Sequence, residues 1–337
     1  MKIKNNLIYF IIIIIFFVFV LESYARFNNP SWHKNDSILG WNLKKNFSHR
    51  YIQKDLEGNI YEALLETNKY SLRFNKNINT TNPDILVIGD SFVADPYASN
   101  DKMWFSVLAN QISKKENKPI IVYAGGGGGY STYQEFLLSQ RLSKILKPKI
   151  FILQFCSNDF GANIYEIEKK SSNLNEFLRR PYPINEKSFF ENSFIANITR
   201  SKLIGESKIY NKLLWRISIF KNSNNLKKKL PTDNNLIAKS EIITFKYLKK
   251  IRKEFIESKA YMVNCEISTK GGSLNAKWKK LAVDSGFVPL ENANIEIEKS
   301  LKKNLNIFYR DGGHYNELGN YIYGKAIYEN MKILYKN

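Results

Sequence analysis

The sequence is most constrained by four short apolar runs, which are separated by segments with the spacing of amphipathic helices. The runs occupy residues 84–88, 120–123, 150–153 and 260–263. Short runs without alternation are typical of strands buried on both faces of a parallel sheet. Helical periodicity fills the gaps, as in Trp104, Val107, Leu108 and Ile112 and in Phe136, Leu137, Leu142 and Ile145. Strands that alternate with helices predict a doubly wound α/β fold with a mostly parallel sheet of about five strands.

The N-terminus carries an export signal. Two lysines precede an unbroken apolar run at residues 7–21, which Glu22 closes. The run is marginal for a membrane span, which needs about 17 to 25 residues. Small residues at positions 23 and 25 are compatible with signal cleavage, but Tyr24 between them and the flanking charges favour an uncleaved anchor. We therefore expect residues 1–26 to be a signal-anchor, with a cleaved signal as the alternative, and the remaining chain to lie in the periplasm or an equivalent exterior.

The remaining chain is long enough for one large α/β domain. Residues 27–80 are polar and aromatic with turn signals, and they predict a β-containing lead-in. Residues 81–337 hold the four apolar runs and form the predicted α/β domain. Between about 161 and 235 the pattern loses strands and gains asparagine and lysine, which predicts a largely helical insertion.

The formal net charge of +20 raises the question of nucleic acid. The lysines are scattered in short clusters, such as those at residues 227–229 and 302–303, which is typical of a solvated surface. The sequence has no helix-turn-helix, zinc or RNA-binding signature, so we expect no nucleic-acid partner. A basic surface suits anionic lipid headgroups or acidic polysaccharide.

Two cysteines, Cys156 and Cys265, exclude a disulfide scaffold and a cysteine-rich zinc site. Both follow predicted strands, so one bridge is feasible if those strands are neighbours in an oxidising compartment. The favoured interpretation is two buried small hydrophobic residues. No metal and no cofactor are expected.

Polar or glycine residues follow three of the predicted strands. Ser91 follows the first, five consecutive glycines at residues 125–129 follow the second, and Asn158 follows the third. Open α/β sheets bind ligands at the carboxyl ends of their strands, so Ser91 is in the right place for a nucleophile. Each motif taken alone is also compatible with an ordinary turn.

Two glycine patterns resemble phosphate-binding loops without meeting their requirements. The run at 125–129 does not spell GxGxxG. Residues 319–325 match the first seven positions of a P-loop, but Ala326 stands where a magnesium-binding Ser or Thr belongs, and no strand precedes it. We therefore interpret residues 319–325 as the start of the last helix.

Asp311 and His314 form the strongest single element. They precede an amphipathic helix, and a short turn between them brings a carboxylate toward the imidazole. The other two histidines, His33 and His49, lie in the lead-in, away from every predicted strand end. His314 is therefore the candidate base.

These four segments resemble the SGNH/GDSL hydrolase superfamily over roughly residues 84–331, and the insertion interrupts the match. The resemblance implies a flavodoxin-like SGNH-hydrolase fold. It implies that Ser91 is the nucleophile, that His314 is the general base and that Asp311 orients it. Ser91 N–H, Gly129 N–H and the Asn158 side-chain amide are the implied oxyanion donors.

Two positions depart from the family pattern. Cys156 stands where the third block has glycine, and five glycines make the second block ambiguous. We assign the oxyanion donor of this block to Gly129, because the segment Gly-Tyr-Ser-Thr that starts there matches the family's second block best.

The lead-in is similar to membrane-anchored bacterial members often associated with cell-surface glycans. The similar segments are Asn35-Asp36, Leu39-Gly40-Trp41 and residues 68–73. The resemblance implies hydrolysis of an O-acyl ester, expected to be O-acetyl, of a cell-surface carbohydrate through an acyl-enzyme. The alternatives are an O-acyltransferase with the same triad and a catalytically idle glycan-binding domain. The absence of GxSxG argues against an α/β-hydrolase nucleophile elbow.

Overall fold

A six-stranded sheet lies at the centre of the computed structural model, which describes residues 2–170, 173–202, 204–225, 234–265 and 277–334. The strand order is β12-β11-β8-β6-β7-β5, and every neighbouring pair is parallel except β5 with β7. The strands are β5 (Arg73–Phe74), β6 (Ile85–Gly89), β7 (Val122–Gly126), β8 (Ile150–Phe155), β11 (Lys259–Asn264) and β12 (Val288–Pro289). The prediction of a doubly wound, mostly parallel sheet is confirmed, with six strands instead of about five. The lysine cluster at residues 227–229 lies outside the described residues.

The four long strands coincide with the four apolar runs because each is covered on both faces. Val87 of β6 pairs with Ala124 of β7 and Ile152 of β8, and all five residues of β6 are buried. The carboxyl end of β7 extends into the glycine run, beyond the predicted strand. The edge strands β5 and β12 have two residues each, too few to give an apolar run.

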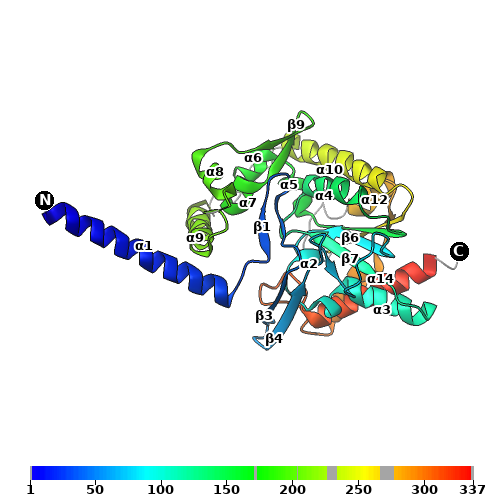
Figure 1. The fold of residues 1–337 in the computed structure, drawn as a ribbon. Coiled ribbons are helices and arrows are strands. Elements are labelled where there is room, and N and C mark those ends of the chain that lie inside the picture. Colours follow the sequence, from blue (N-terminus) through cyan, green and yellow to red (C-terminus); the bar gives the residue numbers. More distant parts are fainter. Residues whose placement is uncertain (1, 171–172, 203, 226–233, 266–276, 335–337) are drawn as a thin grey trace.

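Helices cover both faces of the sheet, as Figure 1 shows. One face packs against α4 (Thr132–Ser143), α10 (Asn234–Glu254) and α12 (Trp278–Asp284). The other face packs against α3 (Trp104–Glu116), α13 (Asn292–Lys302) and α14 (Glu317–Leu334). Two short helices, α2 (Ser91–Ala94) and η1 (Asn100–Lys102), follow β6. After β7, which lies on one side of β6, the chain crosses to the other side of β6 to form β8. The direction in which successive strands are added to the sheet therefore reverses at β6. Folds of this kind bind ligands at such a point.

The lead-in and the insertion form additional layers around this core. The lead-in consists of two antiparallel hairpins, formed by β1 (His33–Asp36) with β2 (Gly40–Leu43) and by β3 (Ser48–Lys54) with β4 (Ile60–Glu66). The insertion contains α5 (Asn158–Ala162), α6 (Tyr165–Glu168), α7 (Leu174–Arg179), α8 (Phe194–Arg200) and α9 (Lys208–Asn225).

The insertion also contains a hairpin that the sequence pattern did not predict. It pairs β9 (Pro181–Ile184) with β10 (Lys187–Phe190). Two prolines in β9 hide its strand character, because proline is depleted in strands. Asn185 and Glu186 make the two-residue turn with φ values of 48° and 65°, as a twisted hairpin of this length requires.

Helix α1 (Lys2–Asn28) projects from the body (Figure 1). Its segment Ile8–Asn28 has a mean hydropathy of 2.5 and none of it is buried. By length and composition this helix could cross a membrane, a test that a signal sequence near an N-terminus also passes.

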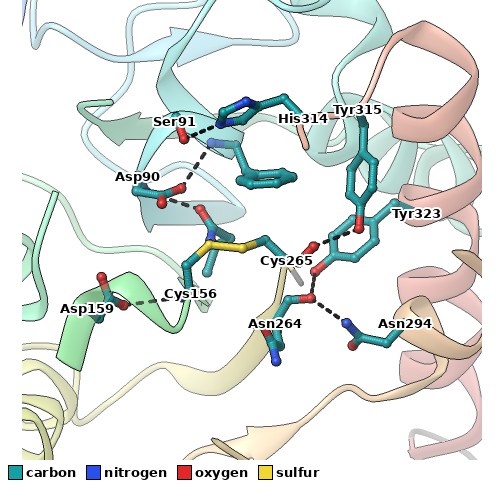
Figure 2. The surroundings of a disulfide bond; sticks show 12 residues. Asp90, Ser91, Cys156, Asp159, Asn264, Cys265, Asn294, His314, Tyr315 and Tyr323 are labelled. Carbon is teal, nitrogen blue, oxygen red and sulfur yellow. Dashed lines mark hydrogen bonds between the residues drawn. A yellow bond between two sulfur atoms is a disulfide. The ribbon is translucent and has the colours of Figure 1, made fainter. Parts of the chain in front are cut away.

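Cys156 and Cys265 form a disulfide, so the favoured interpretation of two unpaired hydrophobic residues is wrong. Phe155 pairs with Asn264 in the β8–β11 ladder, and each cysteine directly follows its strand, which places their Cα atoms 5.7 Å apart. Figure 2 shows the Tyr315 hydroxyl donating to the Cys265 carbonyl over 2.7 Å. The bridged strand ends therefore also hold the residue next to His314.

Loss of this bridge is expected to lower the free energy of unfolding by about 2–4 kcal/mol, because it closes a long loop in the unfolded chain. The two cysteines are 109 residues apart in sequence. Urea unfolding of the oxidised protein, the reduced protein and the Cys156→Ala/Cys265→Ala variant measures the effect. The double variant should be insensitive to reductant. Equal stability of the oxidised and reduced proteins would show that the bridge is not formed or not stabilising.

Candidate active site

Ser91 lies at the start of α2, directly after the carboxyl end of β6. The sharp turn depends on close contact at Gly89, where an added Cβ would lie 2.4 Å from the Gln154 side-chain oxygen. Asp90 then caps α2 by accepting the Phe92 N–H over 3.0 Å. Strand end, glycine and cap together fix the serine at the edge of the sheet, with 8% of its surface exposed.

Asp311 and His314 lie in the loop that joins α13 to α14. One carboxylate oxygen of Asp311 accepts the backbone N–H groups of Gly313 over 2.9 Å and His314 over 3.0 Å. The other oxygen lies 2.6 Å from His314 Nδ1. The opposite ring nitrogen, Nε2, lies 2.7 Å from Ser91 Oγ. The structure therefore brings together all three predicted triad residues, in a row suited to proton transfer from serine to histidine.

The charges around His314 favour its protonated form. Burial by itself lowers the pKa of His314, but the hydrogen bond and charge of Asp311 and the charges of Asp95 and Asp90 raise it above its ordinary value. Burial also raises the pKa of Asp311, yet hydrogen bonds from the His314 ring, His314 N–H and Gly313 N–H bring that pKa down to about 2. Asp311 is thus ionised at neutral pH and stabilises the imidazolium that forms when His314 accepts a proton.

Aromatic rings hold the imidazole in place. Tyr97 stacks on His314 with ring centroids 4.2 Å apart and an interplanar angle of 19°. The Phe92 ring also packs against the imidazole, with the two ring centroids 4.7 Å apart. The Tyr97 hydroxyl donates to Asp95 over 3.3 Å, so this second carboxylate is also tied to the ring that covers His314.

Ser91 and His314 line a pocket with a cavity volume of about 530 Å³. Asn158 lines the same pocket, as do Gly128 and Gly129. Gly129 has φ +70°, a left-handed conformation that favours glycine, and an added Cβ there would lie 2.5 Å from a Glu176 carboxylate oxygen. The structure therefore places the predicted triad, Gly129 and Asn158 near one another. Of the five consecutive glycines, the last two, Gly128 and Gly129, line the pocket.

The lead-in contributes residues that the sequence did not point to. Trp32, His33 and Trp41 line the pocket. His33 Nε2 lies 3.8 Å from Asp95 Oδ1, and the Trp32 indole donates to the same oxygen over 3.3 Å. The expectation that His33 lies away from the site is therefore wrong, because hairpin β1–β2 folds back over the strand ends. Burial, with the charges of Arg179, Lys208 and Lys44, lowers the pKa of His33 to about 3, so its ring is neutral.

The insertion supplies the remaining wall of the pocket, with Asn175, Glu176 and Arg179. Burial raises the pKa of Glu176 to about 7, in spite of the nearby Arg180 charge. No short motif in the sequence marks these residues, since their position depends on how α7 packs.

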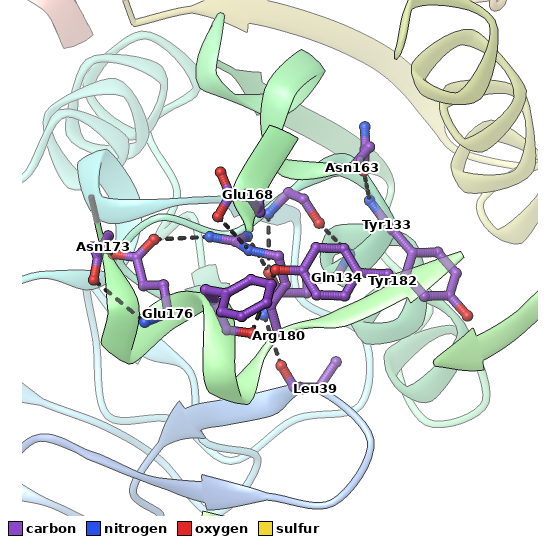
Figure 3. Close-up of polar contacts among 11 residues, drawn as sticks. Leu39, Tyr133, Gln134, Asn163, Glu168, Asn173, Glu176, Arg180 and Tyr182 are labelled. Atoms are coloured by element: carbon purple, nitrogen blue, oxygen red, sulfur yellow. Dashed lines mark hydrogen bonds and ion pairs between the residues drawn. The ribbon is translucent and has the colours of Figure 1, made fainter. Parts of the chain in front are cut away.

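Arg180 fastens the insertion to the core and the lead-in (Figure 3). Its guanidinium donates to Gln134 of α4 over 2.6 Å and to Glu176 over 2.8 Å. The Gln134 amide donates in turn to the Leu39 carbonyl over 2.7 Å. The Arg180 guanidinium also lies 5.4 Å from the centre of the Trp41 ring. Arg180 thus ties α4, the lead-in and the insertion together directly behind the pocket wall to which Trp41 and Glu176 belong. Among the described residues, no group of three His, Cys, Asp or Glu side chains is arranged to hold a metal ion.

No family model and no curated protein matches this sequence. Solved structures overlap with it at low identity. LAE5, an α/β hydrolase enzyme from the metagenome of Lake Arreo in Spain, is 12% identical with a TM-score of 0.42, over 75% of this chain and 96% of its own. A protein assigned to the G-D-S-L lipolytic family from Desulfitobacterium hafniense is 11% identical with a TM-score of 0.34, over 74% and 99%. The acetyl xylan esterase Est2A from Butyrivibrio proteoclasticus is 10% identical with a TM-score of 0.36, over 83% and 68%.

Proposed function

We propose that this chain is an ester hydrolase of the SGNH/GDSL type, in which Ser91, His314 and Asp311 form the catalytic triad. The observation that carries the proposal is the unbroken row from Ser91 Oγ through the imidazole to Asp311, with separations of 2.7 Å and 2.6 Å. This row opens into a pocket at the carboxyl edge of the sheet. A catalytically idle binding domain has no need for this arrangement.

In the proposed reaction, Ser91 Oγ attacks the ester carbonyl carbon while His314 Nε2 takes the hydroxyl proton. The carbonyl electron pair moves onto the oxygen and then returns as the bond to the alcohol breaks. His314 gives its proton to the departing alkoxide, which leaves an acyl group on Ser91. A water molecule, deprotonated by the same nitrogen, then attacks the carbonyl carbon of this acyl-enzyme. The bond from that carbon to Ser91 Oγ breaks, His314 returns its proton to Ser91 Oγ, and the carboxylic acid is released.

The oxyanion formed in each half-reaction needs hydrogen-bond donors. We propose Ser91 N–H, Gly129 N–H and the Asn158 side-chain amide for this role. The positions of these groups support the proposed role. Ser91 is the first residue of α2, and Gly129 and Asn158 line the same pocket as Ser91.

The proposed substrate is an O-acyl ester, O-acetyl above all, on a carbohydrate of the cell surface. The lining of the pocket supports a hydroxyl-rich ligand, because Trp32 and Trp41 offer ring surface while Asn175, Glu176 and Arg179 offer polar groups. Buried polar groups lose hydrogen bonds to water when a long hydrocarbon chain covers them, so such a pocket favours a polar ligand. Transfer of the acyl group to a sugar hydroxyl instead of water would make the same triad an O-acyltransferase.

The proposed location of the catalytic domain is extracytoplasmic. Helix α1 has the length and composition of a membrane anchor or a signal. The Cys156–Cys265 disulfide supports the same side of the membrane, because disulfides persist in oxidising compartments.

We expect the purified protein to be labelled by a serine-directed fluorophosphonate and to cleave acetylated sugars faster than long-chain esters. The reason is that the acetyl group fits beside Ser91 while the sugar fills the polar pocket. Initial rates on a panel of acetylated glycans and esters of increasing acyl length measure the preference, with an added sugar acceptor to detect transfer. Ser91→Ala is the labelling control. Faster turnover of long acyl chains would contradict the carbohydrate proposal and favour a lipase.

A further inference from the structure

Helix α9 exposes an unusual amount of apolar surface. Ile209, Leu213 and Ile217 form one row at i, i+4, i+8 spacing, with 36%, 54% and 44% of their surface exposed. Trp215 and Ile219 form a second row, 59% and 46% exposed. On the side that faces the body, Leu214 and Ser218 are buried. A helix that already has a packed face does not need these two rows for the core of its own domain.

Basic side chains lie between the two apolar rows. Lys212 and Arg216 are both exposed, and their i, i+4 spacing places them along the middle of the outward face. Long basic side chains can lay their methylene stems on apolar surface while the charged ends reach phosphate groups. Apolar residues, tryptophan and basic side chains on one helix are typical of a segment in the plane of a membrane interface.

The end of α1 is fastened to the start of α9. The Glu22 carboxylate accepts hydrogen bonds from Ser207 Oγ over 2.9 Å, Lys208 N–H over 2.9 Å and Ile209 N–H over 3.0 Å. It therefore caps the first turn of α9, whose N–H groups have no partner within the helix. Figure 1 shows α9 beside the part of α1 that is nearest to the body.

This contact fixes the depth of α9 relative to any membrane that α1 enters. The apolar run of α1 ends at Leu21, and Glu22 follows directly. Tyr24 and Phe27, 70% and 84% exposed, continue α1 beyond that point, as is typical of aromatic residues at headgroup level. A helix capped by Glu22 must start at the same level, where the hydrocarbon region ends.

We propose that α9 lies in the headgroup region of an anionic phospholipid bilayer, fastened by Glu22 to α1 as the retained anchor. The rows at Ile209 and Trp215 reach the acyl chains, and Lys212 and Arg216 reach the lipid phosphates. A second copy of the chain fits this face less well, because a symmetric contact would bring these like charges of the two copies together. The proposal does not depend on the reaction at Ser91.

The same arrangement connects the membrane to the pocket. Arg179 of α7 donates to the Asn211 side chain of α9 over 2.6 Å, and the Leu174 N–H donates to Ser218 Oγ over 3.2 Å. Arg179 lines the pocket. A membrane-bound α9 would therefore hold one wall of the pocket at a fixed height above the lipid.

The fluorescence of Trp215 tests the proposal in the full chain. All five tryptophans lie in the described part of the chain, and Trp215 alone is exposed. We expect bromine-labelled acyl chains to quench part of the emission of the full chain in phosphatidylglycerol nanodiscs, and Trp215→Phe to remove that quenched part. Trp278→Phe, which changes a buried ring, is the matched control and should leave the quenched part in place.

Four results would overturn the proposal. Emission that brominated lipid does not quench, with or without dimer formation, would place α9 away from the bilayer. Quenching as strong in phosphatidylcholine as in phosphatidylglycerol would remove the anionic assignment. Glu22→Ala, compared with the exposed Glu57→Ala, should weaken the quenching while α1 stays inserted, and unchanged quenching would contradict the role of Glu22. The N-terminal mass of the purified chain must include α1, because a chain cleaved before Arg26 would contradict the retained anchor.

Discussion

Ser91→Ala is expected to lower kcat on the proposed ester substrate by on the order of 10⁵-fold, and His314→Ala by a similar factor. The serine supplies the oxygen that forms the acyl bond, and its hydroxyl is a poor nucleophile until a base accepts its proton. His314 Nε2, at 2.7 Å, is the base within reach. Residual rate in either variant would come from binding and from the oxyanion donors alone.

The combination of the two substitutions makes the prediction specific. Because serine and histidine act as a unit, the double variant should lose little more activity than either single variant. Ser139→Ala and His49→Ala are matched controls: Ser139 is buried in α4, His49 lies on β3, and neither lines the pocket. Urea unfolding checks that each variant folds. A folded Ser91→Ala variant with near-native kcat would show that this serine is only a turn residue.

The central sheet could be predicted because a strand that is buried on both faces has a short, unbroken run of apolar residues in the sequence. The runs at residues 84–88 and 150–153 became β6 and β8, the two most enclosed strands. The edge strands β5 and β12 have no such run, since two residues cannot show a pattern. Hairpin β9–β10 was missed for a different reason, because its prolines and its turn have the composition of a loop.

The candidate site was predictable where the chain's local geometry decides it. Ser91 and Asn158 follow parallel strands, so topology alone brings them to one edge of the sheet. Asp311 lies three residues before His314, so a local turn joins that pair, and the resemblance to the family placed the pair beside Ser91. His33 and Glu176 reach the pocket only through tertiary packing of the lead-in and the insertion. Sequence periodicity carries no information on such contacts, and the same limit applied to the pairing of Cys156 with Cys265.

Asp311→Asn is expected to lower kcat by on the order of 10⁴-fold while the imidazole stays in place. This loss refers to the plateau of the pH profile, where His314 is neutral. The asparagine amide can present its N–H₂ to His314 Nδ1, which stabilises the tautomer with its proton on Nε2. That tautomer cannot accept the Ser91 proton. The carboxylate also carries the charge that stabilises the imidazolium, and the amide does not.

The pH dependence separates this role from a structural one. Neutral His314 is the active form, and its pKa is raised above the ordinary value of 6.5, so kcat/KM should fall as the pH drops through that raised pKa. In Asp311→Asn the acid limb should move to lower pH, because the hydrogen bond and charge that raise the pKa are lost. Asp95→Asn is the matched control. It removes a more distant charge and leaves the Nδ1 hydrogen bond intact, so its acid limb should also move down while its plateau falls far less. An Asp311→Asn variant with the plateau and acid limb of the parent protein would exclude Asp311 as the partner of His314.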